Sequence, residues 1–160
     1  KKTLKRHAMG WTANPSSTTP IFPGAESDGG GGSTASPDVE NFFVVLGSGS
    51  LKAMDIWASS TGNNTRLGIA LFINNSTTPS LHCTGTMENV SIFGGNRGHL
   101  FVDFTQTNFV SGSSLFNPGD LISIGLSKFG GDTPAKPQAT LYYEVDETKL
   151  ETNQTTGVLG

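Results

Sequence analysis

Short segments in which every second residue is apolar, each ended by turn-forming residues, dominate the chain between residues 51 and 146. In the clearest case the apolar positions are Leu67, Ile69, Leu71 and Ile73, and the segment ends at Asn74-Asn75. A period of two places successive side chains on opposite faces of a β-strand, so each segment is expected to bury one face. A helix would instead need apolar residues three or four positions apart. The pattern therefore predicts an all-β protein.

The composition agrees with this prediction and suggests how the strands pack. Only 14% of the residues are charged, and runs rich in the helix-favouring residues Ala, Leu, Glu and Lys are missing. We expect about seven or eight strands, separated by turns such as Asn117-Pro118-Gly119-Asp120. Two antiparallel sheets packed face to face give every strand one buried face. The sequence thus predicts a jelly-roll-like antiparallel β-sandwich with an extended N-terminal arm.

The boundaries of this arm and of the body follow from a change in composition. Of the 31 residues 10–40, 19 are Gly, Pro, Ser or Thr, including the run Gly29–Gly32, whereas 12 of the 14 aromatic residues lie between Asn41 and Asp146. Residues 1–40 are therefore predicted to form an extended, basic, Gly-Pro-Ser-rich arm, and residues 41–146 the sandwich body. Residues 147–160 are predicted to be a C-terminal extension.

Basic residues are concentrated at the start of the chain, where four of the ten lie within the first six positions. The formal net charge is −3, so the whole chain gives no electrostatic argument for binding nucleic acid. A basic end either docks on an acidic partner or is simply solvated. Large apolar side chains in the arm are natural anchors on a neighbouring subunit. The residues expected to make assembly or docking contacts are Lys1, Lys2, Lys5, Arg6, Trp11, Ile21 and Phe22.

Other sequence features limit the cellular context. No run approaches the roughly 20 apolar residues of a membrane span. The basic start is not followed by an apolar stretch, so we do not expect a secretory signal there, and the missing initiator Met suggests trimming or partial numbering. Cys83 is the only cysteine, which excludes an intramolecular disulfide. Its strand-like surroundings favour a small buried thiol over a reactive one.

Residue types that carry catalysis are present, but their spacing matches no catalytic motif. His82 next to Cys83 lacks the further ligands of a zinc site. Cys83, His99 and Asp103 have the side chains of a nucleophilic triad without a nucleophile elbow. Asp103 and Asp120 could serve as a hydrolase pair only if their carboxylates converged in a cleft. Aspartates beside turns more often hydrogen-bond the backbone, so both are expected to cap turns. The glycine-rich stretch 94–98 predicts a hairpin turn and not a phosphate loop. We therefore expect neither an enzyme nor a cofactor or metal site.

Three stretches resemble the β-rich distal domains of tailed-bacteriophage fibres and virion-surface proteins. They are Ile69–Ile73 with the following Asn74-Asn75, Phe101–Thr105 leading to Phe116–Ile124, and Ala139–Val145. Together they fall in a region of roughly 95 residues, a little over half of the chain. Similar strand-turn-strand units also occur in TNF- and C1q-like trimers and in carbohydrate-binding modules. The resemblance implies a jelly-roll-like sandwich, frequent trimerisation and no cofactor.

Two functions are compatible with these expectations. The first is a non-enzymatic structural protein of the virion surface, either a head decoration, a fibre or a capsid- or tail-associated component. Such a protein would attach to other virion proteins through its arm, preferably as a homotrimer. The alternative is a receptor- or glycan-binding module for host attachment. In that case the aromatic residues Trp57, Phe129 and Tyr142 are candidates for stacking on sugar rings, although packing in the core or between subunits is an ordinary role for them.

Overall fold

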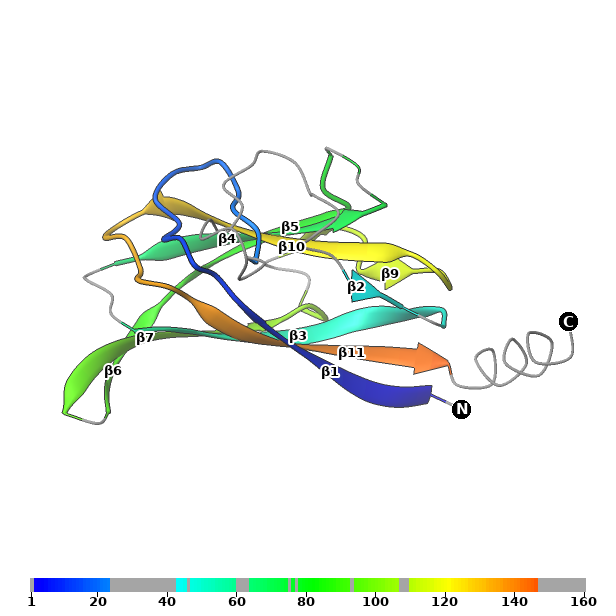
Figure 1. The fold of residues 1–160 in the computed structure, drawn as a ribbon, viewed down its shortest axis with the longest axis horizontal. Helices are drawn as coiled ribbons and strands as arrows, with labels where there is room; N and C mark the ends of the chain where they lie inside the picture. Colours follow the sequence, from blue (N-terminus) through cyan, green and yellow to red (C-terminus); the bar gives the residue numbers. More distant parts are fainter. Residues whose placement is uncertain are drawn as a thin grey trace, which may run out of the picture.

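The computed structural model describes residues 2–23, 43–45, 47–59, 64–74, 76, 78–92, 94–106 and 110–146. These residues form eleven β-strands and no helix (Figure 1). The strands are β1 (Lys2–Gly10), β2 (Phe43–Val44), β3 (Gly49–Ala58), β4 (Arg66–Ile73), β5 (Leu81–Thr86), β6 (Glu88–Ile92), β7 (Gly95–Asp103), β8 (Val110–Gly112), β9 (Leu115–Phe116), β10 (Leu121–Gly130) and β11 (Gln138–Asp146). Within this part of the chain, nothing has the length and apolarity of a membrane-spanning helix.

The strands form two antiparallel sheets that pack face to face. The first sheet has the order β1-β11-β3-β7-β6, with β9 also beside β3, and the second has the order β2-β10-β4-β5-β8. Figure 1 shows the two sheets as layers, with β4, β5 and β10 in one and β1, β3, β7 and β11 in the other. The predicted all-β sandwich is confirmed.

Eight of the strands pair as one long antiparallel ribbon that has been rolled up. β1 pairs with β11, β2 with β10, β3 with β7, and β4 with β5. Rolling the ribbon brings β11 beside β3 and β10 beside β4, which closes the two sheets. This order is that of a jelly roll. The short strands β8 and β9 and the strand β6 lie beside this framework.

Alternate apolar positions of both sheets meet in the core, as the period-two pattern predicts. The largest fully buried side chains include Met54 and Ile56 of β3, Ile124 of β10 and Leu141 of β11. β4 and β10 are unusual because almost every residue in their central parts is buried, on both faces. A second layer of protein must therefore cover the outer face of the second sheet.

Residues 11–23 provide this cover. Phe22 is completely buried against Ala70 and Phe72 of β4, with its ring edge-to-face on Phe72 at 5.4 Å. A Cβ atom at Gly125 of β10 would lie only 2.8 Å from the Cβ of Pro20. Glycine at this position therefore allows the covering segment to approach the sheet closely.

The structure corrects the predicted N-terminal arm. Residues 2–10 are not an extension but the strand β1, which pairs with β11 in an unbroken register from Lys2 opposite Asp146 to Gly10 opposite Gln138. The inward-facing His7 stacks on Phe43 with ring centroids 4.1 Å apart, and burial lowers the pKa of its imidazole. The prediction of an arm failed because the charged residues of β1 lie at a sheet edge, where solvent can reach them.

The continuation from β1 is held in the sandwich by hydrogen bonds. The indole Nε1 of Trp11 donates to the carbonyl oxygen of Ile21 (2.9 Å), and Ile21 exchanges two backbone hydrogen bonds with Leu126 (2.8 and 2.9 Å). Ile21 and β2 lie along the same edge of β10, since Phe43 is opposite Ile122. Residues 24–42, which lie outside the described residues, therefore connect two segments of one sheet edge.

A substitution at Trp11 tests whether residues 11–23 are an integral part of the fold or a separate arm. Because Trp11 is buried in the core, Trp11→Ala is expected to lower the free energy of unfolding by about 3–5 kcal/mol, measured by urea denaturation. The exposed neighbour serves as the control, and Thr12→Ala is expected to change this free energy by less than about 0.5 kcal/mol. Equal stability of the two variants would show that residues 11–23 do not belong to the folded body.

Candidate functional site

The outward-facing side of the first sheet carries the most chemically distinctive side chains among the described residues. On β3, Met54, Ile56 and Ala58 point into the core, whereas Asp55 and Trp57 are only half-buried on the opposite face. This division of β3 follows the period-two alternation of its residues.

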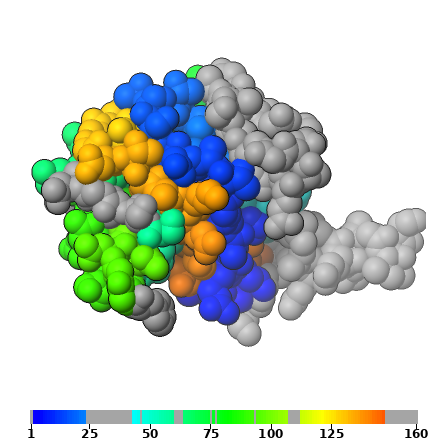
Figure 2. Space-filling view, turned by 60° about the vertical axis from the view of Figure 1, so that its left-hand side comes forward, coloured from blue at the N-terminus to red at the C-terminus, as the bar shows by residue number. Residues whose placement is uncertain are grey.

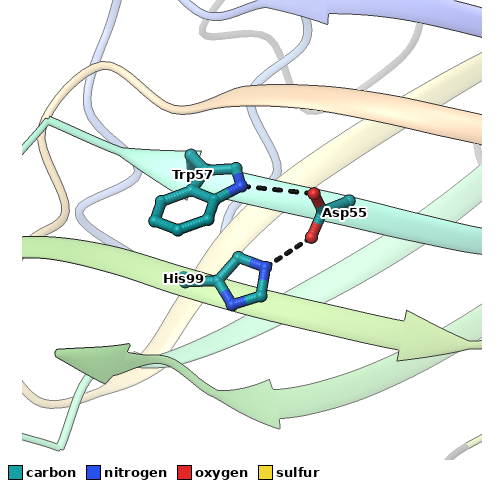
Figure 3. Close-up of polar contacts among 3 residues, drawn as sticks. All are labelled: Asp55, Trp57 and His99. Atoms are coloured by element: carbon teal, nitrogen blue, oxygen red, sulfur yellow. Dashed lines mark hydrogen bonds and ion pairs between the residues drawn. The ribbon is translucent and has the colours of Figure 1, made fainter. Parts of the chain in front are cut away.

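Asp55, Trp57 and His99 form a hydrogen-bonded cluster on this face (Figure 3). The two carboxylate oxygens of Asp55 serve different partners: Oδ2 accepts a hydrogen bond from Trp57 Nε1 (3.2 Å), and Oδ1 lies 2.5 Å from His99 Nε2. Trp57 and His99 are directly opposite in the β3–β7 ladder, and their rings are tilted by 32° with centroids 4.1 Å apart. Together, the carboxylate and the imidazole fix the orientation of the indole.

A depression of about 370 Å³ lies beside this cluster. Its lining includes Trp57, Ser59, Ile92, Arg97, Lys136 and Gln138, and we call it the Trp57 pocket. Figure 2 looks toward this side of the molecule, where the green atoms of β6 and β7 and the orange atoms leading into β11 lie on the same face, with the end of β3 in teal between them. Three chain segments that are far apart in the sequence thus build one pocket.

The β6–β7 hairpin supplies one side of the Trp57 pocket. Ile92 is opposite Gly95 at the tip, and Arg97 is opposite Val90 two residues along the ladder. Gly94 has a φ of 73°, which a glycine adopts at little cost. A hairpin is present where the glycines predicted one, but its turn is tighter than the stretch 94–98, because residues 95–98 already belong to β7. The hairpin places Arg97 in the lining of the pocket.

The segment before β11 supplies the other side and holds Lys136 in an unusual conformation. Lys136 has a φ of 42°, in the left-handed region that is unfavourable for a side chain with a Cβ atom. Its backbone N–H donates to Oδ1 of Asn14 (2.8 Å), and the carbonyl oxygen of Ala135 accepts from both the N–H and the hydroxyl of Ser59 (3.0 and 3.1 Å). Strain of this kind is concentrated at functional sites.

Positive charge at the Trp57 pocket is not neutralised by ion pairs with carboxylates of the described residues. Among the residues that the structure describes, neither Arg97 nor Lys136 takes part in an ion pair. The guanidinium of Arg97 donates a hydrogen bond to the carbonyl oxygen of the adjacent Asn96 (3.2 Å). The oriented Trp57, the two cationic residues Arg97 and Lys136, and Gln138 therefore line a common space. This combination is suited to a polar ligand with an apolar face.

The other two aromatic candidates lie elsewhere. Phe129 belongs to β10 on the second sheet, where it is 42% exposed and contacts His82 edge-to-face at 5.5 Å. Tyr142 is half-buried on β11, opposite Arg6 of β1, and it is not part of the Trp57 pocket lining. The structure therefore does not bring Trp57, Phe129 and Tyr142 together in one site.

The residues expected to make docking contacts also separate into two groups. Trp11, Ile21 and Phe22 are only 3%, 7% and 0% exposed, so they pack within this chain and are not available as anchors on another subunit. The basic docking candidates Lys2, Lys5 and Arg6 belong to the edge strand β1. The ammonium group of Lys2 lies 3.9 Å from the carboxylate of Glu144. Lysines on an edge strand oppose pairing with other chains. Lys1 lies outside the described residues.

The residues considered for nucleophilic catalysis are kept apart by the sandwich. Cys83 points into the core from β5, and burial raises the pKa of its thiol to about 12. His99 faces outward from the other sheet. A free, buried thiol agrees with the role expected for Cys83.

The two candidate acidic residues serve as turn caps, as the sequence predicts. Asp103 Oδ1 accepts hydrogen bonds from the hydroxyl and the N–H of Thr105 (2.6 and 2.9 Å), and these bonds lower the pKa of its carboxyl group. Asp120 accepts from the N–H of Asn117 (2.7 Å) and the amide of Asn74 (3.0 Å). Over the described part of the chain, no group of three His, Cys, Asp or Glu side chains is arranged to hold a metal ion.

Sequence reasoning identified Trp57 but missed the cations that surround it. The sequence pattern places Arg97 only in a glycine-rich hairpin, and Lys136 stands between prolines in the segment Pro134–Pro137. A lysine flanked so closely by prolines indicates a constrained loop, which was the one available signal. The chain matches no protein-family model and no curated protein.

The backbone strain at Lys136 can be measured as a change in the free energy of unfolding. Lys136→Gly removes the steric cost of the left-handed backbone, about 1–2 kcal/mol, against an entropic cost of about 0.5–1 kcal/mol for glycine. Chemical denaturation is therefore expected to show a net stabilisation of about 0.5–1 kcal/mol. Ala135→Gly, one residue earlier and without a positive φ, should destabilise the protein. Similar losses in both variants would mean that Lys136 is not strained.

Proposed function

We propose that this chain is a non-enzymatic structural protein of a virion surface, such as a head decoration, a fibre or a capsid- or tail-associated component. The observation that carries the proposal is the pairing order of the eight principal strands, which is that of a jelly roll. Jelly rolls are a recurrent architecture of viral capsid proteins and of lectins. The resemblance of three strand-and-turn stretches to phage fibre and virion-surface domains supports the same function.

Residues 2–23 are built into the sandwich, and we propose that the sandwich itself supplies part of the attachment surface. Leu4 and Phe101 are 60% and 56% exposed on the outer face of the first sheet, and Leu115 of β9 is 66% exposed. Contiguous apolar patches mark interaction sites, and Leu4 and Phe101, on strands separated by β11 and β3, are separate contact points on this face. We propose that the first sheet contacts other virion proteins or further copies of this chain, with a homotrimer as the preferred oligomer.

Localisation on the particle tests the virion function. Cryo-electron microscopy of particles from the source of this chain is expected to show ordered copies, with the outer face of the first sheet against a neighbouring protein. In solution, light scattering of Phe101→Asp is expected to give a monomer where the wild type gives a trimer. Phe129→Asp, on the second sheet, is the matched control and should remain trimeric. A wild-type monomer that is absent from particles would refute the proposal.

A second candidate function is saccharide binding for host attachment, and it is favoured by the Trp57 pocket. The indole provides an apolar surface for the C–H face of a sugar ring, and Ser59 and Gln138 provide polar groups for its hydroxyls. The two functions are compatible, since a protein of the virion surface can also recognise the host. A broad panel of glycans on which the folded protein binds nothing would contradict this second function.

A further inference from the structure

We propose that the Trp57 pocket binds an anionic pyranose, a sugar ring that carries a carboxylate or a sulfate group. The ring stacks on the indole of Trp57, and its anionic group is bound by Arg97 and Lys136. This inference rests on the second candidate function, saccharide binding, and adds the class of ligand and the residues that select it.

The indole of Trp57 is organised before any ligand arrives. Its Nε1 is held by Asp55, and the imidazole of His99 stacks beside it, so the ring has little freedom left to lose on binding. Preorganised aromatic side chains give contact area at a low entropic cost. His99 does not line the Trp57 pocket, which leaves the indole as the aromatic surface offered to a ligand there.

The two cations explain why the ligand should carry a negative charge. Arg97 comes from the β6–β7 hairpin and Lys136 from the segment before β11, and both residues line the same depression. Two positive charges that share a pocket repel one another, and an anion between them removes this cost. The guanidinium of Arg97 matches the planar arrangement of oxygens in a carboxylate and also binds sulfate oxygens.

The backbone at Lys136 provides an independent observation. The left-handed backbone conformation of Lys136 is energetically costly for a lysine, even with the hydrogen bond from its N–H to Asn14. Glycine at the same position would avoid this cost. The side chain must therefore supply something that glycine lacks, and its position at the Trp57 pocket indicates ligand binding. Strain at such a position is compensated by hydrogen bonds elsewhere, here from the side chains of Asn14 and Ser59.

A saccharide fits the surroundings better than a nucleic acid, the other polyanion that stacks on tryptophan. Single-stranded nucleic acids are bound in grooves where many cations follow the backbone. Here the cationic residues of the pocket lining are Arg97 and Lys136, two residues and not a row that could follow a nucleic-acid backbone. The volume of about 370 Å³ lies near the lower end for small-molecule sites and suits a short stretch of sugar units.

Binding measurements with defined polymers test this inference. The probes are polygalacturonate for the carboxylate, chondroitin sulfate for a sulfated and carboxylated chain, dextran as a neutral saccharide, and oligothymidylate as the nucleic acid. The wild type is expected to bind at least one acidic saccharide with an affinity that falls as salt is added, and to bind dextran at least tenfold more weakly, as lost charge-assisted contacts imply.

Three substitutions separate stacking from charge recognition. Trp57→Ala is expected to weaken binding of the acidic saccharide by about tenfold or more, and Arg97→Gln and Lys136→Gln by about fivefold to tenfold each. Lys136 is exposed, so its variant is expected to fold even if Trp57→Ala does not. Circular dichroism and the unfolding midpoint of each variant verify that the fold is intact.

Lys2→Gln is the matched control for the change in charge. Lys2 and Gly10 lie at opposite ends of β1, about 26 Å apart at the usual rise of a strand. Gly10 pairs with Gln138 of the Trp57 pocket, so Lys2 is far from the pocket although it lies on the same sheet. It should bind like the wild type within about twofold, since exposed charges beyond the Debye length are screened. A loss equal to that of Lys136→Gln would indicate an effect of net charge and overturn the assignment to the Trp57 pocket.

Each result with the probes has a definite meaning. Binding of polygalacturonate shows that a carboxylate suffices, and binding of chondroitin sulfate shows recognition of an acidic sugar chain that carries carboxylate and sulfate, so both support the inference. Equal binding of dextran through Trp57 would retain saccharide binding and overturn the requirement for an anion. No binding to any saccharide by the folded wild type would overturn both. Tighter binding to oligothymidylate than to the saccharides would replace a sugar with a nucleic acid as the ligand.

Discussion

The pairing of β1 with β11 is the interaction on which the rest of the structure depends. Its nine-residue register satisfies the backbone of the first strand and covers what would otherwise be an open edge of β11. The same pairing delivers Trp11 to the core and directs residues 11–23 across to β10, where they cover the second sheet. Without β1, the apolar residues on the outer face of β4, such as Phe72, would lose their cover from Phe22.

The Trp57 pocket is linked to this pairing through a few hydrogen bonds. The N–H of Trp11 donates to the carbonyl oxygen of Pro137 (2.9 Å), and Asn14, three residues later, binds the backbone of Lys136. The loop that presents Lys136 is therefore held against the N-terminal segment, while Trp57 stands on a central strand of the first sheet. Functional groups on loops fixed to a rigid scaffold can be strained without loss of the overall fold.

The two proposed functions use different parts of one surface. Leu4 and Phe101 provide apolar area on the outer face of the first sheet, and the Trp57 pocket lies at one end of that sheet. Phe101 is two positions along β7 from His99, so a subunit contact at Phe101 would lie next to the pocket. A protein that assembles through this face and binds an acidic sugar beside the contact would couple attachment to oligomerisation, because multivalent sites raise apparent affinity.

The sequence alone determined the all-β class, the inward-facing Leu67, Ile69 and Leu71 of β4, the turn at 117–120 and the buried state of Cys83. These features are local, because the two faces of a strand follow from its own alternation and a turn follows from its own residues. Only the tertiary structure decided that residues 2–23 belong to the sandwich and that Arg97 and Lys136 meet at Trp57. In β1 the outward Leu4 and inward Lys5 run against the usual alternation, so its strand character depends on its partner β11. Contacts between distant segments depend on which edges pair, and no period in the sequence records that choice.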